Sequence, residues 1–153
     1  MKKNILKSIL FLVFIFSPIL LYAQKKQLAT ARESLKTGKE LVKAEKSMQN
    51  LLEDSVNRTN TKIWVMLCDI LMKQYEQGNE KLYLKQQYDT AAFFSVTKRM
   101  YETMAKFDSI DAHLNMPSPV LPKYRERHAQ FLNSIRPNLF NGGTYFLHVK
   151  DYK

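Results

Sequence analysis

Three histidines and one cysteine are the residues of this 153-residue chain best suited to chemistry near neutral pH. No two of His113, His128 and His148 have the spacing of metal ligands, and the chain has no glycine-rich phosphate loop and no G-x-S-x-G motif. Cys68 lies in the run "IWVMLCDILM", where nine of ten residues are apolar. We therefore predict satisfied or solvated histidines and a buried, unreactive thiol that has no partner for an internal disulfide.

Two pairs of carboxylates could in principle act as acid and base or bind a cation. Glu53 and Asp54 are adjacent, and neighbouring side chains on a helix diverge by about 100°. Asp108 and Asp111 lack the further oxygen ligands that calcium needs. A helix end and a turn account for both pairs. The sequence thus predicts a protein that is not an enzyme, with no cofactor and no metal site.

The first 23 residues have the three parts of a secretory signal. They contain three lysines and no acid, followed by the apolar run "ILFLVFIFSPILLYA" that ends at Ala23. Ser17 and Pro18 interrupt this run just before the small residue, which favours cleavage after Ala23. The alternative is an uncleaved membrane anchor, because the 19 residues from Ile5 to Ala23 nearly match a bilayer span. In both cases residues 24–153 are predicted to lie in the periplasm, at the cell envelope or in the medium.

The exported part of the chain is basic. Residues 24–153 contain 21 Lys and Arg residues (24 in the chain less 3 in the signal) against 14 Asp and Glu, a formal charge of +7. Lys-rich, solvated helix surfaces are the simplest interpretation. The alternative is a patch that binds an anionic membrane surface or polyanion, formed by Lys123, Arg125, Arg127 and Arg136. We expect no nucleic-acid partner for an exported chain.

Beyond Ala23 the apolar residues recur at intervals of three and four, which predicts an all-α domain. The polar turn "NRTNT", Asn57 to Thr61, is rich in cap residues and precedes the most apolar segment, and Gly38 supplies a helix stop. Gly78 and Asn79 are expected to kink or interrupt that apolar helix. We predict one long loop at residues 108–119, and Pro137 should close one helix or open the next. The expected helices cover residues 26–36, 40–55, 61–77 with a continuation toward 87, 89–107, 119–135 and 138–149.

The C-terminal stretch "NLFNGGTYFLHVKDYK" resembles the first helix of a tetratricopeptide repeat. Leu139 takes the place of the large residue, Gly143 that of the glycine and Phe146 that of the aromatic, while Gly142 departs from the expected leucine. Lys150 to Tyr152 resemble the turn between the two helices of a repeat. In this pattern Gly143 would let a neighbouring helix approach closely, with Phe146 filling the groove beside it.

Two further places resemble the same repeat. "QYDTAAFF" places Ala91 or Ala92 at the small residue that opens a second helix, and "KTGKELVKAEKSM" places Ala44 there. The chain is therefore similar to exported bacterial tetratricopeptide-like repeat proteins over most of residues 26–153. The spacings of 47 and 64 residues between equivalent positions are not multiples of 34, so the expected repeats are irregular. An unrelated helical bundle is the alternative.

The resemblance implies antiparallel helix hairpins stacked as an irregular superhelix. It also implies a non-enzymatic module that binds a protein or peptide at the cell envelope. A membrane would be a partner only through an uncleaved anchor or surface charge. Because the second helix of the last repeat would begin just past Lys153, we expect a truncated repeat protein, or a C-terminal end that docks on something that supplies the missing half.

Overall fold

The computed structural model describes residues 23–114 and 122–149, and within them the chain is all-α with no strand. A first helix covers residues 23–37. It is followed by α2 (Leu41–Glu53), α3 (Thr61–Tyr83), α4 (Thr90–Leu114) and α5 (Arg125–His148). The predicted all-α class is confirmed.

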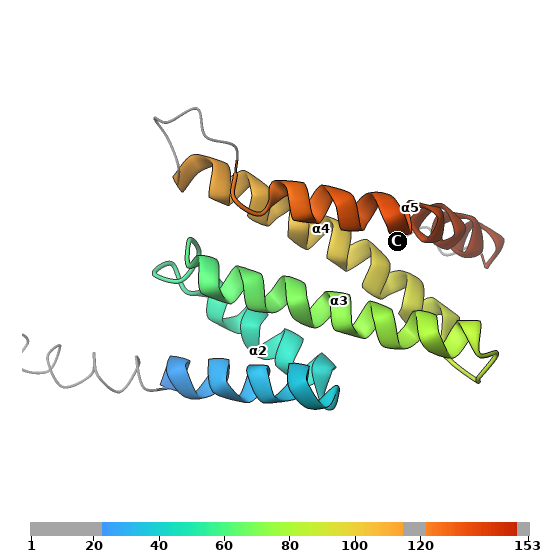
Figure 1. The fold of residues 1–153 in the computed structure, drawn as a ribbon, viewed down its shortest axis with the longest axis horizontal. Coiled ribbons are helices and arrows are strands. Elements are labelled where there is room, and N and C mark those ends of the chain that lie inside the picture. The colour runs from blue at the N-terminus through green and yellow to red at the C-terminus, as the bar shows by residue number, and fades with distance from the viewer. Residues whose placement is uncertain (1–22, 115–121, 150–153) are drawn as a thin grey trace, which may run out of the picture.

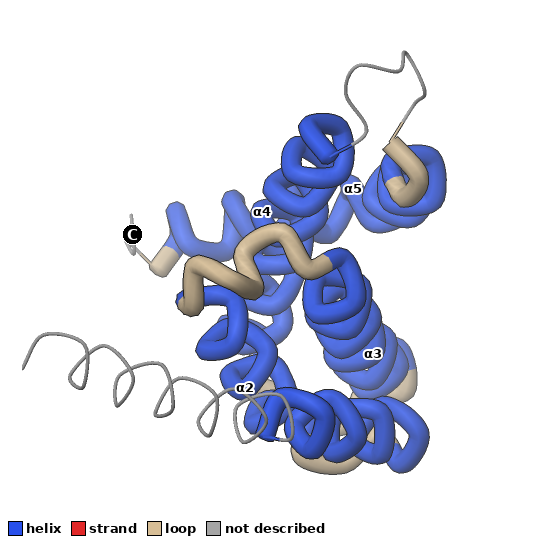
Figure 2. Tube along the Cα trace, turned by 90° about the vertical axis from the view of Figure 1, so that its left-hand side faces the viewer, coloured by secondary structure: helices blue, strands red, loops and turns tan. Residues whose placement is uncertain are grey.

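Each helix from α2 onward packs against the next one along the chain: α2 on α3, α3 on α4 and α4 on α5. Figure 1 shows α3 crossing the middle of the molecule, with the first helix and α2 on one side and α4 and α5 on the other. The view turned by 90° keeps the same order (Figure 2). An apolar helix in this central place must bury more than one face.

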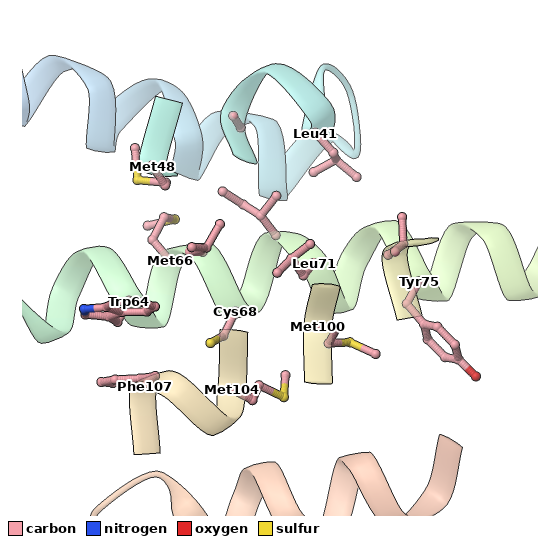
Figure 3. Close-up of a cluster of buried hydrophobic side chains, with 14 of the residues drawn as sticks. Leu41, Met48, Trp64, Met66, Cys68, Leu71, Tyr75, Met100, Met104 and Phe107 are labelled. Carbon is pink, nitrogen blue, oxygen red and sulfur yellow. The ribbon is translucent and has the colours of Figure 1, made fainter. Parts of the chain in front are cut away.

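The core is built on both sides of α3. Its buried residues include Ile63, Leu67, Ile70 and Leu71, each at most 3% exposed. In Figure 3, Met48 of α2 lies on one side of α3, and Met100, Met104 and Phe107 of α4 lie on the other. The expectation of a helix covered on several sides, drawn from its nearly continuous apolar sequence, is confirmed.

Polar residues at the helix ends satisfy backbone groups as the sequence indicated. The Asn60 side chain accepts a hydrogen bond from the Lys62 N–H at 3.1 Å and caps α3. At the end of the first helix, Gly38 has φ +69°, and its N–H donates to the Ser34 carbonyl at 2.8 Å. A glycine suits this left-handed position because it carries no Cβ.

The predicted interruption of α3 at Gly78 and Asn79 is wrong. The helix continues to Tyr83, and Gly78 is buried within it. A Cβ at Gly78 would lie 2.8 Å from Phe93 Cδ2. Gly78 is therefore a point of close approach between α3 and the start of α4. The packing gained there outweighs the cost of a glycine within a helix, which is about 1 kcal/mol relative to alanine.

The predicted loop at residues 108–119 starts too early. The helix α4 runs on to Leu114, so residues 108–114 are helical, and residues 115–121 lie outside the described part. Asp108 and Asp111 belong to the last turns of α4, and Asp111 is 4% exposed. The apolar periodicity of the sequence ends at this point because the inward-facing residues Asp108 and Asp111 are carboxylates.

Pro137 neither ends a helix nor begins one. The two helices predicted on either side of it form the single helix α5. An interior proline loses one hydrogen bond and clashes with the preceding turn, at a cost of about 3 kcal/mol. Packing on both sides offsets this cost, since Ile135 is buried and the Asn138 amide donates to the Tyr75 hydroxyl at 2.5 Å.

The predicted signal segment lies outside the described residues, apart from Ala23 at the start of the first helix. Among the helices of residues 23–114 and 122–149, none combines the length and the apolar character needed to cross a bilayer.

Candidate functional site

A groove of about 620 Å³ lies between α2 and α4 and is the candidate functional site. Both helices pack on α3, but their backbones do not come close to each other. Successive turns face each other across the gap, with Leu52 and Glu53 on α2 and Glu102, Thr103 and Lys106 on α4.

An ion pair with a buried carboxylate spans the gap between α2 and α4 near the groove. Arg99 Nε lies 2.8 Å from Glu45 Oε1, and one terminal guanidinium nitrogen lies 3.2 Å from Glu45 Oε2. The Glu45 carboxylate also accepts hydrogen bonds from the Gln74 amide at 2.8 Å and the Gln49 amide at 3.2 Å. Four donors therefore satisfy a carboxylate whose side chain is only 5% exposed.

The floor of the groove is apolar and rigid. Trp64 and Leu67 of α3 form it. The Trp64 ring stacks on Phe107, with centroids 5.9 Å apart and planes 10° apart. Figure 3 shows the two rings side by side. The Trp64 indole N–H donates to the Arg58 carbonyl at 2.8 Å, which fixes the ring to the turn between α2 and α3.

Charges of both signs surround this floor. Arg58 lies at one end of the groove, and Lys106 Nζ lies 5.7 Å from the centroid of the Trp64 ring. Glu53 is exposed, and Glu102 reaches Lys98 only at 4.0 Å. An apolar floor with a rim of both charges suits a peptide or a protein segment, which presents apolar and charged side chains together.

Cys68 and His128 lie on the other side of α3, where α4 and α5 meet it. Burial raises the pKa of the Cys68 thiol to about 12, helped by the negative charges of Asp69 and Asp108. The predicted burial of Cys68 is confirmed, and a protonated thiol is a poor nucleophile, which supports the prediction that Cys68 is unreactive. His128 is 3% exposed, and its Nδ1 lies 2.5 Å from Asp108 Oδ1, which ties α5 to α4.

The other two histidines are on the surface. His113 Nδ1 lies 2.5 Å from the Ser109 carbonyl, and His148 is exposed. Among the residues that the structure describes, no three His, Cys, Asp or Glu side chains are grouped so that they could hold a metal ion.

The two adjacent glycines of the repeat pattern have different surroundings on α5. A Cβ added at Gly143 would meet nothing within 4 Å, and Gly143 is exposed. The close approach is at Gly142 instead, where a Cβ would lie 3.0 Å from Phe94 Cδ1 on α4. Within the described residues the prediction that a neighbouring helix approaches closely at Gly143 therefore stays untested, and the observed close approach to α4 is one residue earlier, about 100° around the helix.

The remaining repeat-packing residues differ in their environments. Ala44 is 4% exposed and faces the core, whereas Ala91 and Ala92 are half-buried in the first turn of α4. Leu139 and Phe146 are half-buried on α5, and the Phe146 ring contacts Tyr145. Tyr152 lies outside the described residues.

The four residues of the predicted basic patch do not form a cluster of free cations. Arg127 pairs with Asp69 at 3.0 Å, and Lys123 Nζ lies 5.4 Å from the ring centroid of Tyr124. Arg125 and Arg136 are exposed on α5, but eleven residues of helix separate them by about 16 Å. Positive charge is therefore spread along α5.

The groove and its ion pair were missed by reasoning from the sequence. A signal was present, because Glu45 lies on the inward face of α2 with Leu41, Ala44 and Met48. A carboxylate on an apolar face needs a buried donor. Arg99 was the matching signal on α4, since it directly precedes the fully buried Met100.

Comparison with known proteins found no family model, no curated protein and no solved structure that matches the chain.

Proposed function

We propose that this chain is a non-enzymatic interaction module that binds a protein or peptide. The observation that carries the proposal is the groove between α2 and α4, with its apolar floor of Trp64 and Leu67 and its rim of both charges. The walls are preformed, because the Glu45–Arg99 ion pair and the Trp64 indole hydrogen bond hold them without a ligand. A preformed surface lowers the entropy cost of binding.

The proposal includes a tetratricopeptide-like stack of antiparallel hairpins. The first helix and α2 would form one hairpin, α3 and α4 the second, and α5 would begin a third. Packing of each helix on its chain neighbour supports this arrangement. So do the close approaches at Gly78 and Gly142, where bulkier residues would collide with Phe93 and Phe94.

The proposed location is the periplasm or cell envelope. Its support is the sequence of residues 1–23, with basic residues, an apolar run and a small residue in signal-peptide order. Alkaline phosphatase fused after residue 30 would be active only if the segment directs export. Activity of the same fusion with Lys2, Lys3 and Lys7 unchanged but Leu12 and Phe14 replaced by Asp would contradict the proposal.

The test of partner binding uses two matched threonine substitutions. Thr103→Arg places a long charged side chain in the groove, and Thr144→Arg makes the same change on the exposed side of α5. An envelope protein retained by the unmodified chain should be lost with Thr103→Arg and kept with Thr144→Arg. Recovery of no specific partner, or equal retention by both variants, would count against binding in the groove.

A second candidate function is binding to an anionic membrane surface, favoured by the net charge of +7 on residues 24–153. It predicts retention on anionic vesicles that fades with salt and weakens in the double variant Arg125→Gln, Arg136→Gln. The ion pair of Arg127 with Asp69 leaves less free charge than the sequence indicated, and we rank this function second.

A further inference from the structure

A second cavity, of about 180 Å³, lies between the first helix and α2. It exists because small side chains face each other there: Ala31 and Ser34 on the first helix, Ala44 and Ser47 on α2. Larger residues on the same two helices, among them Leu35 and Met48, pack toward the core. The cavity and the groove are separate, because no residue lines both of them.

The Ser34 hydroxyl is the unusual group in this cavity. Ser34 is only 7% exposed, yet its hydroxyl makes no hydrogen bond with the part of the chain that the structure describes. In the described residues, every fully buried side-chain nitrogen or oxygen has a hydrogen-bond partner. The Ser34 oxygen has none among those residues, so it must be accessible, and Ser34 lines the cavity. Water in the cavity can bond to this hydroxyl, and a bound molecule that accepts its proton would take the place of that water.

The other polar groups around the cavity are mainly donors. Lys26 and Gln27 come from the first helix, and Lys43 and Ser47 come from α2. Glu40 is the one carboxylate on the rim, and it lies 3.6 Å from Lys43 in a largely exposed pair that contributes little. Residues 23–53 contain seven Lys and Arg against four Glu, a formal charge of +3, so the local field also favours an anion.

We propose that this cavity binds a phosphate group, with Ser34 as the buried donor and Lys26 and Lys43 as the charged rim. A phosphate has enough oxygens to accept from two hydroxyls and two ammonium groups at once. A volume of 180 Å³ equals that of roughly six liquid waters, enough for a phosphate group and part of its hydration. The group is carried either by the free ion or by a lipid headgroup.

The first test titrates the full chain with inorganic phosphate and compares it with chloride at matched ionic strength. Phosphate should shift the backbone amide signals of Ala31, Ser34, Ala44 and Ser47, and it should raise the melting temperature more than chloride does. Ser34→Ala should weaken phosphate binding roughly tenfold, because a hydrogen bond to a charged group is lost. Ser34→Val should abolish it by also filling the cavity.

Matched controls separate a site from general charge. Ser134→Ala removes a hydroxyl from an exposed serine on α5, and Lys62→Gln removes an exposed lysine at the start of α3. Both should bind phosphate as the unmodified chain does, whereas Lys26→Gln should bind several-fold more weakly. A helical spectrum for every variant shows that the comparison is between folded proteins.

The second test identifies the carrier of the phosphate group. Vesicles of phosphatidylcholine doped with phosphatidic acid should retain the unmodified chain but not Ser34→Val if the group belongs to a lipid, and free phosphate should then compete. Binding of free phosphate without vesicle retention would assign the site to the ion.

The proposal is overturned if phosphate acts no differently from chloride, which would mean that the cavity holds only water. It is also overturned if Ser34→Val binds phosphate as well as Ser134→Ala does. The groove variant Thr103→Arg should leave phosphate binding unchanged, so failure of the phosphate site and failure of the proposed function are distinguishable.

Discussion

Glu45 and Arg99 form a two-point ion pair across 54 residues of sequence, with the shorter contact at 2.8 Å. It links α2 directly to α4, although the backbones of these two helices do not come close to each other. The Glu45 side chain is 5% exposed and that of Arg99 is 38% exposed, so the carboxylate depends on its donors more than the guanidinium depends on the carboxylate. The pair therefore stabilises the fold and fixes the separation of the groove walls.

Removing Arg99 should destabilise the protein and loosen the groove. Arg99→Ala leaves a buried carboxylate with only amide donors, and we expect a loss of about 1–3 kcal/mol in the free energy of unfolding. Lys98→Ala, which removes an exposed partner of Glu102 at 4.0 Å, should change it by less than about 0.5 kcal/mol. Urea denaturation measures both, and equal effects would contradict the structural role of the pair.

Two adjacent glycines on α5 should respond in opposite ways to alanine. Gly142→Ala places a Cβ against Phe94 and should destabilise the protein by about 1–3 kcal/mol. Gly143→Ala meets open space and should stabilise it by about 0.5–1 kcal/mol, because alanine favours the helix. Thermal and urea unfolding of the two variants check the prediction. The opposite order would mean that Gly143, and not Gly142, faces a neighbouring helix.

Pro137→Ala should make the protein more stable. Alanine restores the N–H that the proline lacks in the middle of α5, and Pro137 is exposed, so no packing is lost. We expect a gain of about 1–3 kcal/mol in the free energy of unfolding. A loss instead would show that the proline itself is required for contacts such as that of Asn138 with Tyr75.

The Cys68 thiol should make stability fall at high pH. Its pKa is about 12 in the folded protein and about 8.5 in an unfolded chain, so the folded state retains a proton that the unfolded state loses. The contribution is complete below about pH 8.5 and is lost as the pH rises toward 12. Subtracting the stability curve of Cys68→Ala isolates the thiol from the lysines and tyrosines that titrate in the same range.

The same thiol should resist a disulfide reagent such as Ellman's reagent at pH 8 until the protein is unfolded in urea. Rapid reaction in the native state would contradict the burial of Cys68, which is 1% exposed.

Local sequence patterns were enough to determine the all-α class, the stop at Gly38, the cap at Asn60 and the burial of Cys68. Each depends on a property of one helix: the spacing of apolar residues at three and four, or a residue that satisfies the backbone at a helix end. Such terms act over one or two turns of a helix.

Three other features depended on how helices meet. Pro137 remains inside α5 and Gly78 inside α3 because packing against neighbouring helices exceeds the local cost of each residue. Gly142 and Gly143 lie about 100° apart around the axis of α5, and only Gly142 faces α4 closely. A repeat pattern with two consecutive glycines does not determine which of them faces a neighbouring helix.

The groove and the Ser34 cavity also depend on how the helices pack. Each lies between helices whose separation is set by residues elsewhere: by Glu45 with Arg99 for the groove, and by the larger side chains beside Ala31 and Ala44 for the cavity. The sequence alone determined which faces of the helices are apolar. Helix packing decided where those faces leave space, because the distance between two helices depends on the volumes of side chains from both of them.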